Sequence, residues 1–128
     1  MKPPAFDYHR PATVDQALRL LAERPAGGEG DAKPLAGGQS LIPAMNFRLA
    51  RPAVLVDLNG VSELSYITAG TDELRIGAMT RQRAVERSAD VARLAPLVHQ
   101  TMPFIAHPQI RNRGTVGGSL AHADPAAE

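Results

Sequence analysis

Hydrophobic and polar residues in the first third of the chain alternate in a strand-then-helix pattern. Residues 6–9 alternate apolar and polar side chains and predict a short strand, which Pro11 ends. Thr13 follows as a helix N-cap, and Gln16, placed three residues later, completes a capping box. We expect this helix to end at Pro25. Its predicted buried face consists of Val14, Ala17, Leu18 and Leu21.

The next segment repeats the pattern. After a polar loop over residues 29–32, residues 34–36 predict a short buried strand. A helix follows from Ser40, the expected N-cap, to about Phe47, with a proline tolerated in its first turn. Residues 53–58 are continuously apolar up to an aspartate, which predicts a strand buried on both faces. Strands that alternate with helices in this way predict a small α/β unit with a parallel sheet.

The pattern changes after Asn59-Gly60. Residues 64–68 and 74–78 predict two strands of a hairpin. Thr80 is expected to cap a helix that runs to about Ser88. A further helix is predicted over residues 90–101, with a kink or break at its proline. Its predicted buried face consists of Val91, Leu94, Leu97 and Val98.

We therefore predict an α+β (α/β) protein. A small parallel βαβ subdomain over residues 1–58 precedes the start of a mixed, antiparallel α+β subdomain over residues 59–128. The last residues have the form of a helix start, with Asp124 as the N-cap and a proline at the first helical position. A chain that stops where a helix begins is expected to be truncated, so we predict an N-terminal fragment of a longer protein.

Composition excludes several classes of function. The chain has no cysteine, which rules out disulfides, thiolate catalysis and cysteine-ligated clusters within it. Its net charge of +1 gives no reason to expect nucleic acid as a partner. No apolar run reaches the length of about 20 residues that a membrane helix needs, and no secretory signal precedes Phe6, so a cytoplasmic protein is expected.

Two glycine pairs carry the candidate chemistry. A strand that enters a helix through Gly37-Gly38 presents unpaired backbone N–H groups to an anion, and glycine lets a phosphate approach closely. The segment 114–119 offers similar chemistry, and Arg111 and Arg113 could neutralise phosphate. Each segment also fits a plainer interpretation: a strand-to-helix turn for the first, a hairpin or bulge for the second, and solvated surface for the arginines.

The histidines give no sign of a catalytic or metal centre. They are scattered, and His122 with Asp124 would fall short of the three or four converging ligands that a metal needs. No serine–histidine–acid arrangement is indicated either. We therefore predict no catalytic and no metal-binding residue, and interpret the chain as a cofactor holder.

Taken together, the two glycine segments, 36–43 and 110–128, closely resemble the FAD-binding, medium subunit of molybdenum hydroxylases. Residues 76–80 and 56–58 match further segments of that family, so the resemblance spans nearly the whole chain. It is nearest to the aerobic carbon monoxide dehydrogenase-like branch, which has a histidine at the position of His122. The resemblance implies the PCMH-type FAD-binding fold, in which FAD lies between two subdomains.

The resemblance also implies which residues contact FAD. The first glycine turn would wrap the pyrophosphate and the second would lie against the pyrophosphate and the flavin, with an acidic position and weaker carry-overs nearby. The implied cofactor-binding residues are Leu35, Ala36, Gly37, Gly38, Gln39, Ser40, Leu41, Met79, Ala106, Thr115, Gly117, Gly118, Ser119 and Asp124.

The implied activity is electron transfer within an oxidoreductase. A large partner subunit would hydroxylate substrate at a molybdenum–pterin centre, and a small partner with [2Fe-2S] clusters would pass electrons to FAD and on to an external acceptor. The subunits would form a dimer of heterotrimers. The alternative is a truncated, non-catalytic module that acts only through subunit contacts and does not hold FAD alone. A third possibility is an unrelated enzyme that binds a phosphorylated metabolite.

Overall fold

The computed structural model describes residues 1–24, 27 and 30–127. The chain divides into two compact units, residues 1–63 and 64–128, each of which has its own core. The predicted helix stop at Pro25 and the beginning of the predicted loop at Glu29 lie outside the described residues. No helix in the described part of the chain is long and apolar enough to cross a membrane.

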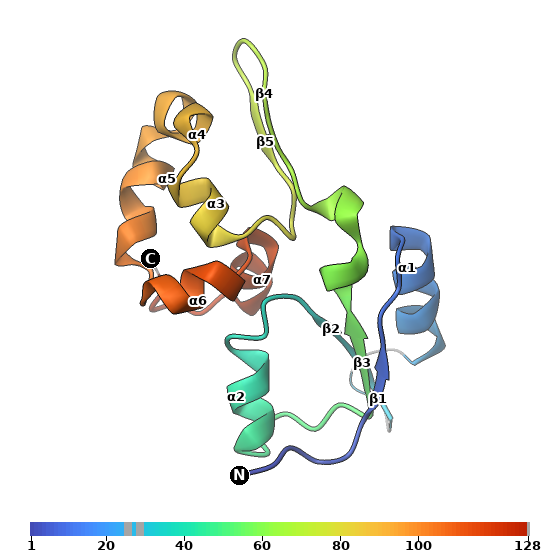
Figure 1. The fold of residues 1–128 in the computed structure, drawn as a ribbon. Coiled ribbons are helices and arrows are strands. Elements are labelled where there is room, and N and C mark those ends of the chain that lie inside the picture. The colour runs from blue at the N-terminus through green and yellow to red at the C-terminus, as the bar shows by residue number, and fades with distance from the viewer. Residues whose placement is uncertain (25–26, 28–29, 128) are drawn as a thin grey trace. The chain divides into compact units, whose positions relative to one another are not determined.

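The first unit is built around a three-stranded parallel sheet (Figure 1). Its strands are β1 (Asp7–His9), β2 (Ala32–Leu35) and β3 (Val54–Asp57), and β3 lies between the other two. Tyr8 pairs with Leu55 on one side, and Leu35 pairs with Asp57 on the other. The helices α1 (Val14–Glu23) and α2 (Leu41–Asn46) connect the strands. The predicted parallel βαβ arrangement is confirmed.

The core of this unit lies between α1 and the central strand. Every residue of β3 is buried, as its continuous apolar character predicted. Val54 and Val56 pack with Ala17 of α1 and with Ala32. Leu21 packs against this core as predicted. The prediction was wrong at Leu18, which is exposed, because α1 turns Leu20 toward the core instead. Ala32, predicted in a loop, begins β2 and is buried.

The second unit joins an antiparallel hairpin to a group of short helices (Figure 1). The hairpin strands are β4 (Ile67–Ala69) and β5 (Leu74–Ile76). The helices are α3 (Gln82–Glu86), α4 (Ala89–Leu94), α5 (Pro96–Thr101), α6 (Pro108–Arg113) and α7 (Val116–His122). Hairpin residues Ile67 and Ile76 pack on a core that contains Val85 and Val91. The predicted antiparallel start of this region is confirmed.

Pro96 breaks the predicted helix over residues 90–101 into α4 and α5. Proline lacks the N–H that a continuous helix needs there and is accepted as the first residue of a new one. After the break, the side chains of α5 no longer continue the buried face of α4. Val91 is therefore fully buried, whereas Leu97 and Val98, predicted as buried, are exposed.

Helix caps were predicted with mixed success. Thr13 caps α1 by accepting a hydrogen bond from the backbone N–H of Gln16. Ser40 makes no such bond at α2 and has helical backbone angles. Thr80 does not cap α3 either, because its hydroxyl bonds the backbone of Tyr66, both N–H and carbonyl, and Arg81 occupies the N-cap position.

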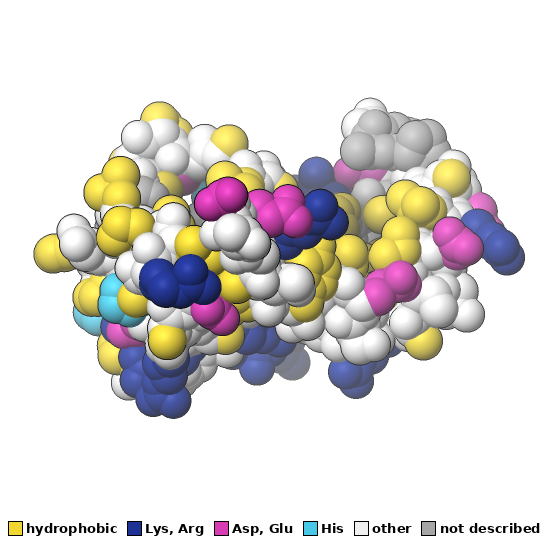
Figure 2. Space-filling view, turned by 90° about the horizontal axis from the view of Figure 1, so that it is seen from above, with side chains coloured by type: hydrophobic (Ala, Val, Ile, Leu, Met, Phe, Trp, Pro, Cys, Tyr) yellow, Lys and Arg dark blue, Asp and Glu magenta, His cyan; other side chains and the backbone are white. Residues whose placement is uncertain are grey.

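Charged side chains of both signs lie on the surface. On the face shown in Figure 2, Lys and Arg side chains are interspersed with Asp and Glu side chains within each unit. This distribution agrees with the net charge of +1. Large hydrophobic side chains are also exposed, including Phe47 and Leu49 in the first unit and Leu97, Phe104 and Leu120 in the second.

Candidate cofactor-binding site

The first glycine pair forms a turn between β2 and α2, in which Gly37 is buried and Gly38 half-buried; we call it open because its backbone donors are unpaired. Gly38 has a φ of +75°, a left-handed conformation that favours glycine. Its carbonyl accepts a hydrogen bond from the N–H of Ile42, which starts the helix. Within the described part of the chain, the backbone N–H groups of Gly37, Gly38, Gln39 and Ser40 donate no hydrogen bond to protein atoms. A turn with such open donors is suited to an anionic ligand.

Side chains from β1, from the last residue of β3 and from the segment after β3 form hydrogen bonds that hold this turn in place. The Asn59 amide Nδ2 donates to the carbonyl of Ala36 at 2.9 Å and also to the Asp57 carboxylate. Asp57 accepts two further hydrogen bonds, from the backbone N–H of Asn59 at 2.9 Å and from the hydroxyl of Tyr8. Because Asp57 pairs with Leu35, the last residue of β2, the carboxylate and the amide of Asn59 lie where the turn begins.

The ionised form of Asp57 is the stable one in this network. Burial, which leaves Asp57 only 7% exposed, would by itself raise its pKa. The hydrogen bonds from Tyr8 and Asn59 outweigh burial, so the pKa of Asp57 lies below its ordinary value. The same hydrogen bond to Asp57 raises the pKa of Tyr8. The carboxylate therefore stays charged and the phenol stays protonated at neutral pH.

The second glycine pair is a helix start rather than a loop, hairpin or bulge. Thr115 is the N-cap of α7, and its hydroxyl accepts the N–H of Gly118 at 3.1 Å. The N–H of Val116 bonds the carbonyl of Thr80, and that of Gly117 bonds the carbonyl of Ala78. The N–H groups here are thus already satisfied, which leaves hydroxyls and glycine Cα atoms for contact with a ligand.

Gly117 allows a close approach between backbones. A Cβ at this position would lie 2.6 Å from the Cβ of Ala78 and 2.8 Å from its carbonyl oxygen. No side chain fits at that distance, so glycine is needed here for packing. Thr115, predicted to contact the cofactor, is 2% exposed, and its hydroxyl accepts the hydrogen bond that caps the helix. Ser119, also predicted to contact the cofactor, is exposed.

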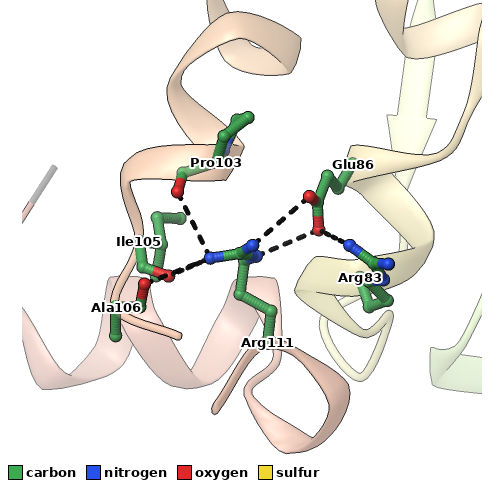
Figure 3. A network of polar contacts seen from close by, with 6 residues as sticks. All are labelled: Arg83, Glu86, Pro103, Ile105, Ala106 and Arg111. Atoms are coloured by element: carbon green, nitrogen blue, oxygen red, sulfur yellow. Dashed lines mark hydrogen bonds and ion pairs between the residues drawn. The ribbon is translucent and has the colours of Figure 1, made fainter. Parts of the chain in front are cut away.

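Arg111 is buried, contrary to the interpretation of its segment as solvated surface. Its guanidinium donates to the Glu86 carboxylate, with 3.0 Å between Nε and Oε2, and a second ion pair joins Glu86 to Arg83 (Figure 3). These hydrogen bonds hold the pKa of Glu86 below its ordinary value. The other end of the guanidinium donates to the carbonyls of Pro103, Ile105 and Ala106.

This ion-pair network fixes the conformation around Ala106. Ala106 has a φ of +41°, an unusual conformation for a residue with a side chain. Its carbonyl accepts from Arg111 at 3.2 Å, as does that of Ile105 at 2.7 Å. Ala106 itself is exposed and available to a ligand.

The remaining predicted residues differ in accessibility. Met79 is buried, and its N–H bonds the carbonyl of Leu64. Asp124 is exposed and accepts a hydrogen bond from the N–H of Ala126. The predicted residues from 35 to 41 gather at one edge of the sheet in the first unit, and those from 79 to 124 belong to the second unit. No group of three or more His, Asp or Glu residues that could hold a metal occurs among the described residues.

Comparison with known proteins decides the family. Residues 4–128 match the model of the FAD binding domain in molybdopterin dehydrogenase. The chain belongs to this family. It is 52% identical over its full length to the 6-hydroxypseudooxynicotine dehydrogenase complex subunit alpha of Paenarthrobacter nicotinovorans. It is 47% identical over 125 residues, 98% of its length, to the carbon monoxide dehydrogenase medium chain of Afipia carboxidovorans. In both comparisons it spans 42% of the relative, less than half its length.

The fold of this FAD-binding domain agrees with a solved structure. It superimposes on a chain of the carbon monoxide dehydrogenase from Hydrogenophaga pseudoflava with a TM-score of 0.94 and 43% identity. The match covers 100% of this chain and 43% of that one. The predicted resemblance to the carbon monoxide dehydrogenase-like branch is therefore confirmed. Sequence reasoning did not single out Tyr8 and Asn59. For Asn59 the available signal was a polar residue soon after the end of a parallel strand, whereas Tyr8 lies inside β1 and carried no such signal.

Proposed function

We propose that this chain holds FAD in the electron-transfer subunit of a molybdenum-containing hydroxylase. The observation that carries the proposal is the open turn at Gly37-Gly38, whose N–H donors have no partner among the described protein atoms. The pyrophosphate of FAD supplies charged oxygens that can accept hydrogen bonds from such donors, and Gly38 adopts the left-handed conformation of the turn without the strain that a side chain would bring. The cofactor performs the redox chemistry, and the protein orients it.

The residues proposed to contact FAD remain those implied by the sequence. In the first unit, residues 35–41 would take the pyrophosphate through their backbone. In the second unit, Ser119 and the glycines of α7 would contact the cofactor through a hydroxyl and through Cα atoms, because their N–H groups already bond Thr115 and Ala78. Thr115, Ala106, Met79 and Asp124 would complete the set. Residues 1–58 and 59–128 would form the first FAD subdomain and part of the second.

The proposed route takes electrons from [2Fe-2S] clusters through FAD to an external acceptor. The clusters belong on a small partner subunit, because this chain has no cysteine to ligate them. A large partner would carry the molybdenum–pterin centre, and two heterotrimers would assemble. The named substrates of the relatives, carbon monoxide and 6-hydroxypseudooxynicotine, differ too much in chemistry to assign one here. A cytoplasmic location stays a prediction.

The test is to purify the intact protein with any partner subunits and record its visible spectrum. We expect a flavin band and release of FAD on denaturation, identified by chromatography. A preparation that releases no flavin would contradict the proposal. Titration of the isolated 128-residue chain with FAD addresses the alternative: micromolar binding would exclude a module that cannot hold FAD alone. We expect the isolated chain to have no enzymatic activity.

A further inference from the structure

We propose that Tyr8, Asp57 and Asn59, here called the strand-end network, position the open glycine turn for the pyrophosphate. The inference rests on the proposed function. These would be positioning residues, which act on the cofactor through the turn. Each comes from a different place in the first unit: Tyr8 from β1, Asp57 from the end of β3, and Asn59 from the short 3-10 helix η1 (Leu58–Gly60).

The network connects the turn, which follows β2, to the other two strands of the sheet. Asn59 Nδ2 donates to the carbonyl of Ala36, the residue between β2 and the glycine pair. The Asp57 carboxylate accepts from both the backbone and the side chain of Asn59, which fixes the orientation of the amide. The Tyr8 hydroxyl bonds the same carboxylate from β1. A chain of hydrogen bonds therefore runs from β1 through β3 to the carbonyl at the start of the turn.

Close packing keeps η1 in the position this requires. A Cβ at Gly60 would lie 2.5 Å from the carbonyl oxygen of Pro11, so the backbone after Asn59 lies directly against the segment that follows β1. Asn59 is consequently held from both sides, by Asp57 before it and by this contact after it. An asparagine in such a setting has little freedom to release Ala36.

The turn itself has few other constraints. Its glycines have intrinsically broad conformational freedom, and Ser40 makes no side-chain bond to the helix that follows. The side chain of Gln39 bonds the carbonyl of Gly37, which is a contact within the turn. Fixing Ala36 through Asn59 reduces the conformational entropy that the turn loses when a ligand binds, so open donors become aligned before the ligand arrives.

The experiment measures FAD affinity in the intact protein after the flavin has been removed, by following flavin fluorescence on rebinding. Asn59→Ala removes the bond to Ala36 and is expected to weaken FAD binding about tenfold. Tyr8→Phe removes only a hydroxyl from a half-exposed residue and is expected to weaken it by about twofold to threefold. Matched controls are Asn112→Ala, on the exposed side of α6, and Tyr66→Phe, and both are expected to bind as the parent does.

A double-mutant cycle separates positioning from general stability. Gly38→Ala strains the turn directly, because alanine rarely adopts a φ of +75°. If Asn59 acts through the turn, the losses in FAD affinity from Asn59→Ala and Gly38→Ala will be less than multiplicative when combined. Multiplicative losses, or parental affinity in Asn59→Ala, would overturn the inference. Should Asn59→Ala fail to fold, the same cycle is run with Tyr8→Phe.

The parent protein distinguishes this inference from the function on which it rests. If the parent, with its flavin removed, does not rebind FAD, the proposed function fails and the positioning role fails with it. If the parent rebinds FAD and the variants bind equally well, only the positioning role is wrong.

Discussion

The two glycine pairs of this domain look alike in sequence and differ in structure. At Gly37-Gly38 the backbone donors are left open and the conformation is left-handed at Gly38. At Gly117-Gly118 the donors are used, one by the carbonyl of Ala78 and one by the hydroxyl of Thr115. We propose that the first pair receives a ligand through its unpaired backbone donors, whereas Gly117 of the second pair lets two backbones pack closely.

The surroundings of the two pairs differ in the same way. The first turn is held at one carbonyl, Ala36, by the amide of Asn59. In the region before the second pair, the buried guanidinium of Arg111 donates hydrogen bonds to the Glu86 carboxylate and to several backbone carbonyls at once. A Gly-Gly pair in a sequence thus indicates only that a Cβ is unfavourable at that position. Whether a ligand or another segment of backbone lies beside the glycines has to be inferred from the hydrogen-bond partners of their N–H groups.

The largest loss of stability is expected from Arg111→Met, which tests whether the region before the second glycine pair is held by the hydrogen bonds of the buried guanidinium. The change removes the guanidinium and keeps much of its aliphatic volume. It leaves the carbonyls of Ile105 and Ala106, and the partly buried Glu86 carboxylate, without the donor that Arg111 provides. We expect a loss of about 4 kcal/mol in the free energy of unfolding, measured with denaturant. Arg93→Met is the control, because that ion pair with Asp90 is exposed and should contribute less than about 0.5 kcal/mol.

A loss no greater than that of the control would mean that the buried ion pair does not hold the second region. The left-handed conformation of Ala106 would then need another cause, and the contrast with the first turn would weaken.

Gly117→Ala is expected to have the next largest effect. The new methyl would meet backbone atoms of Ala78, which cannot move without shifting the start of α7. We expect about 3 kcal/mol of destabilisation, from thermal or denaturant unfolding. Gly70→Ala adds the same methyl at the hairpin tip, where its nearest contact is the flexible side chain of Glu73, and should change stability little. Equal stability for both variants would contradict the packing role of Gly117.

Much of the fold could be predicted because its signals are local. The continuous apolar run over residues 53–58 predicted a central parallel strand, and the hairpin pattern around residue 70 predicted an antiparallel pair. Thr13 was identified as a cap because its partner, Gln16, lies three residues away. The phase of an amphipathic helix was less certain: Leu18 faces solvent, and a proline break redirected Leu97.

The site was harder to predict because its decisive contacts are distant in sequence. The sequence left Arg111 either as a group that neutralises phosphate or as solvated surface, yet it is buried and its carboxylate partner lies 25 residues away in α3. The second glycine pair carried a Thr115 cap signal, but glycine is a poor helix former and the segment was interpreted as a loop. That the N–H of Gly117 is occupied by Ala78 depends on tertiary structure alone.

The smallest loss of stability is expected from removing the Tyr8 hydroxyl. The pH dependence of this loss tests whether the hydroxyl helps to hold the first turn. Because Tyr8 is half-exposed, Tyr8→Phe should cost less than about 1 kcal/mol at neutral pH. The folded pKa of Tyr8 is raised above its ordinary value of 10.0, so the unfolded chain loses this proton first as the pH rises. The parent should therefore lose stability above pH 10 in a way that the Phe variant does not.

Asp57 gives the opposite dependence: its pKa lies below the ordinary 3.8, so its contribution to stability persists above that pH and is lost as the pH falls below it. Unfolding curves of the parent, Tyr8→Phe and Asp57→Asn across both ranges measure the two effects. If the parent and Tyr8→Phe lose stability in parallel above pH 10, the hydroxyl does not depend on Asp57, and the first turn is held from β3 alone.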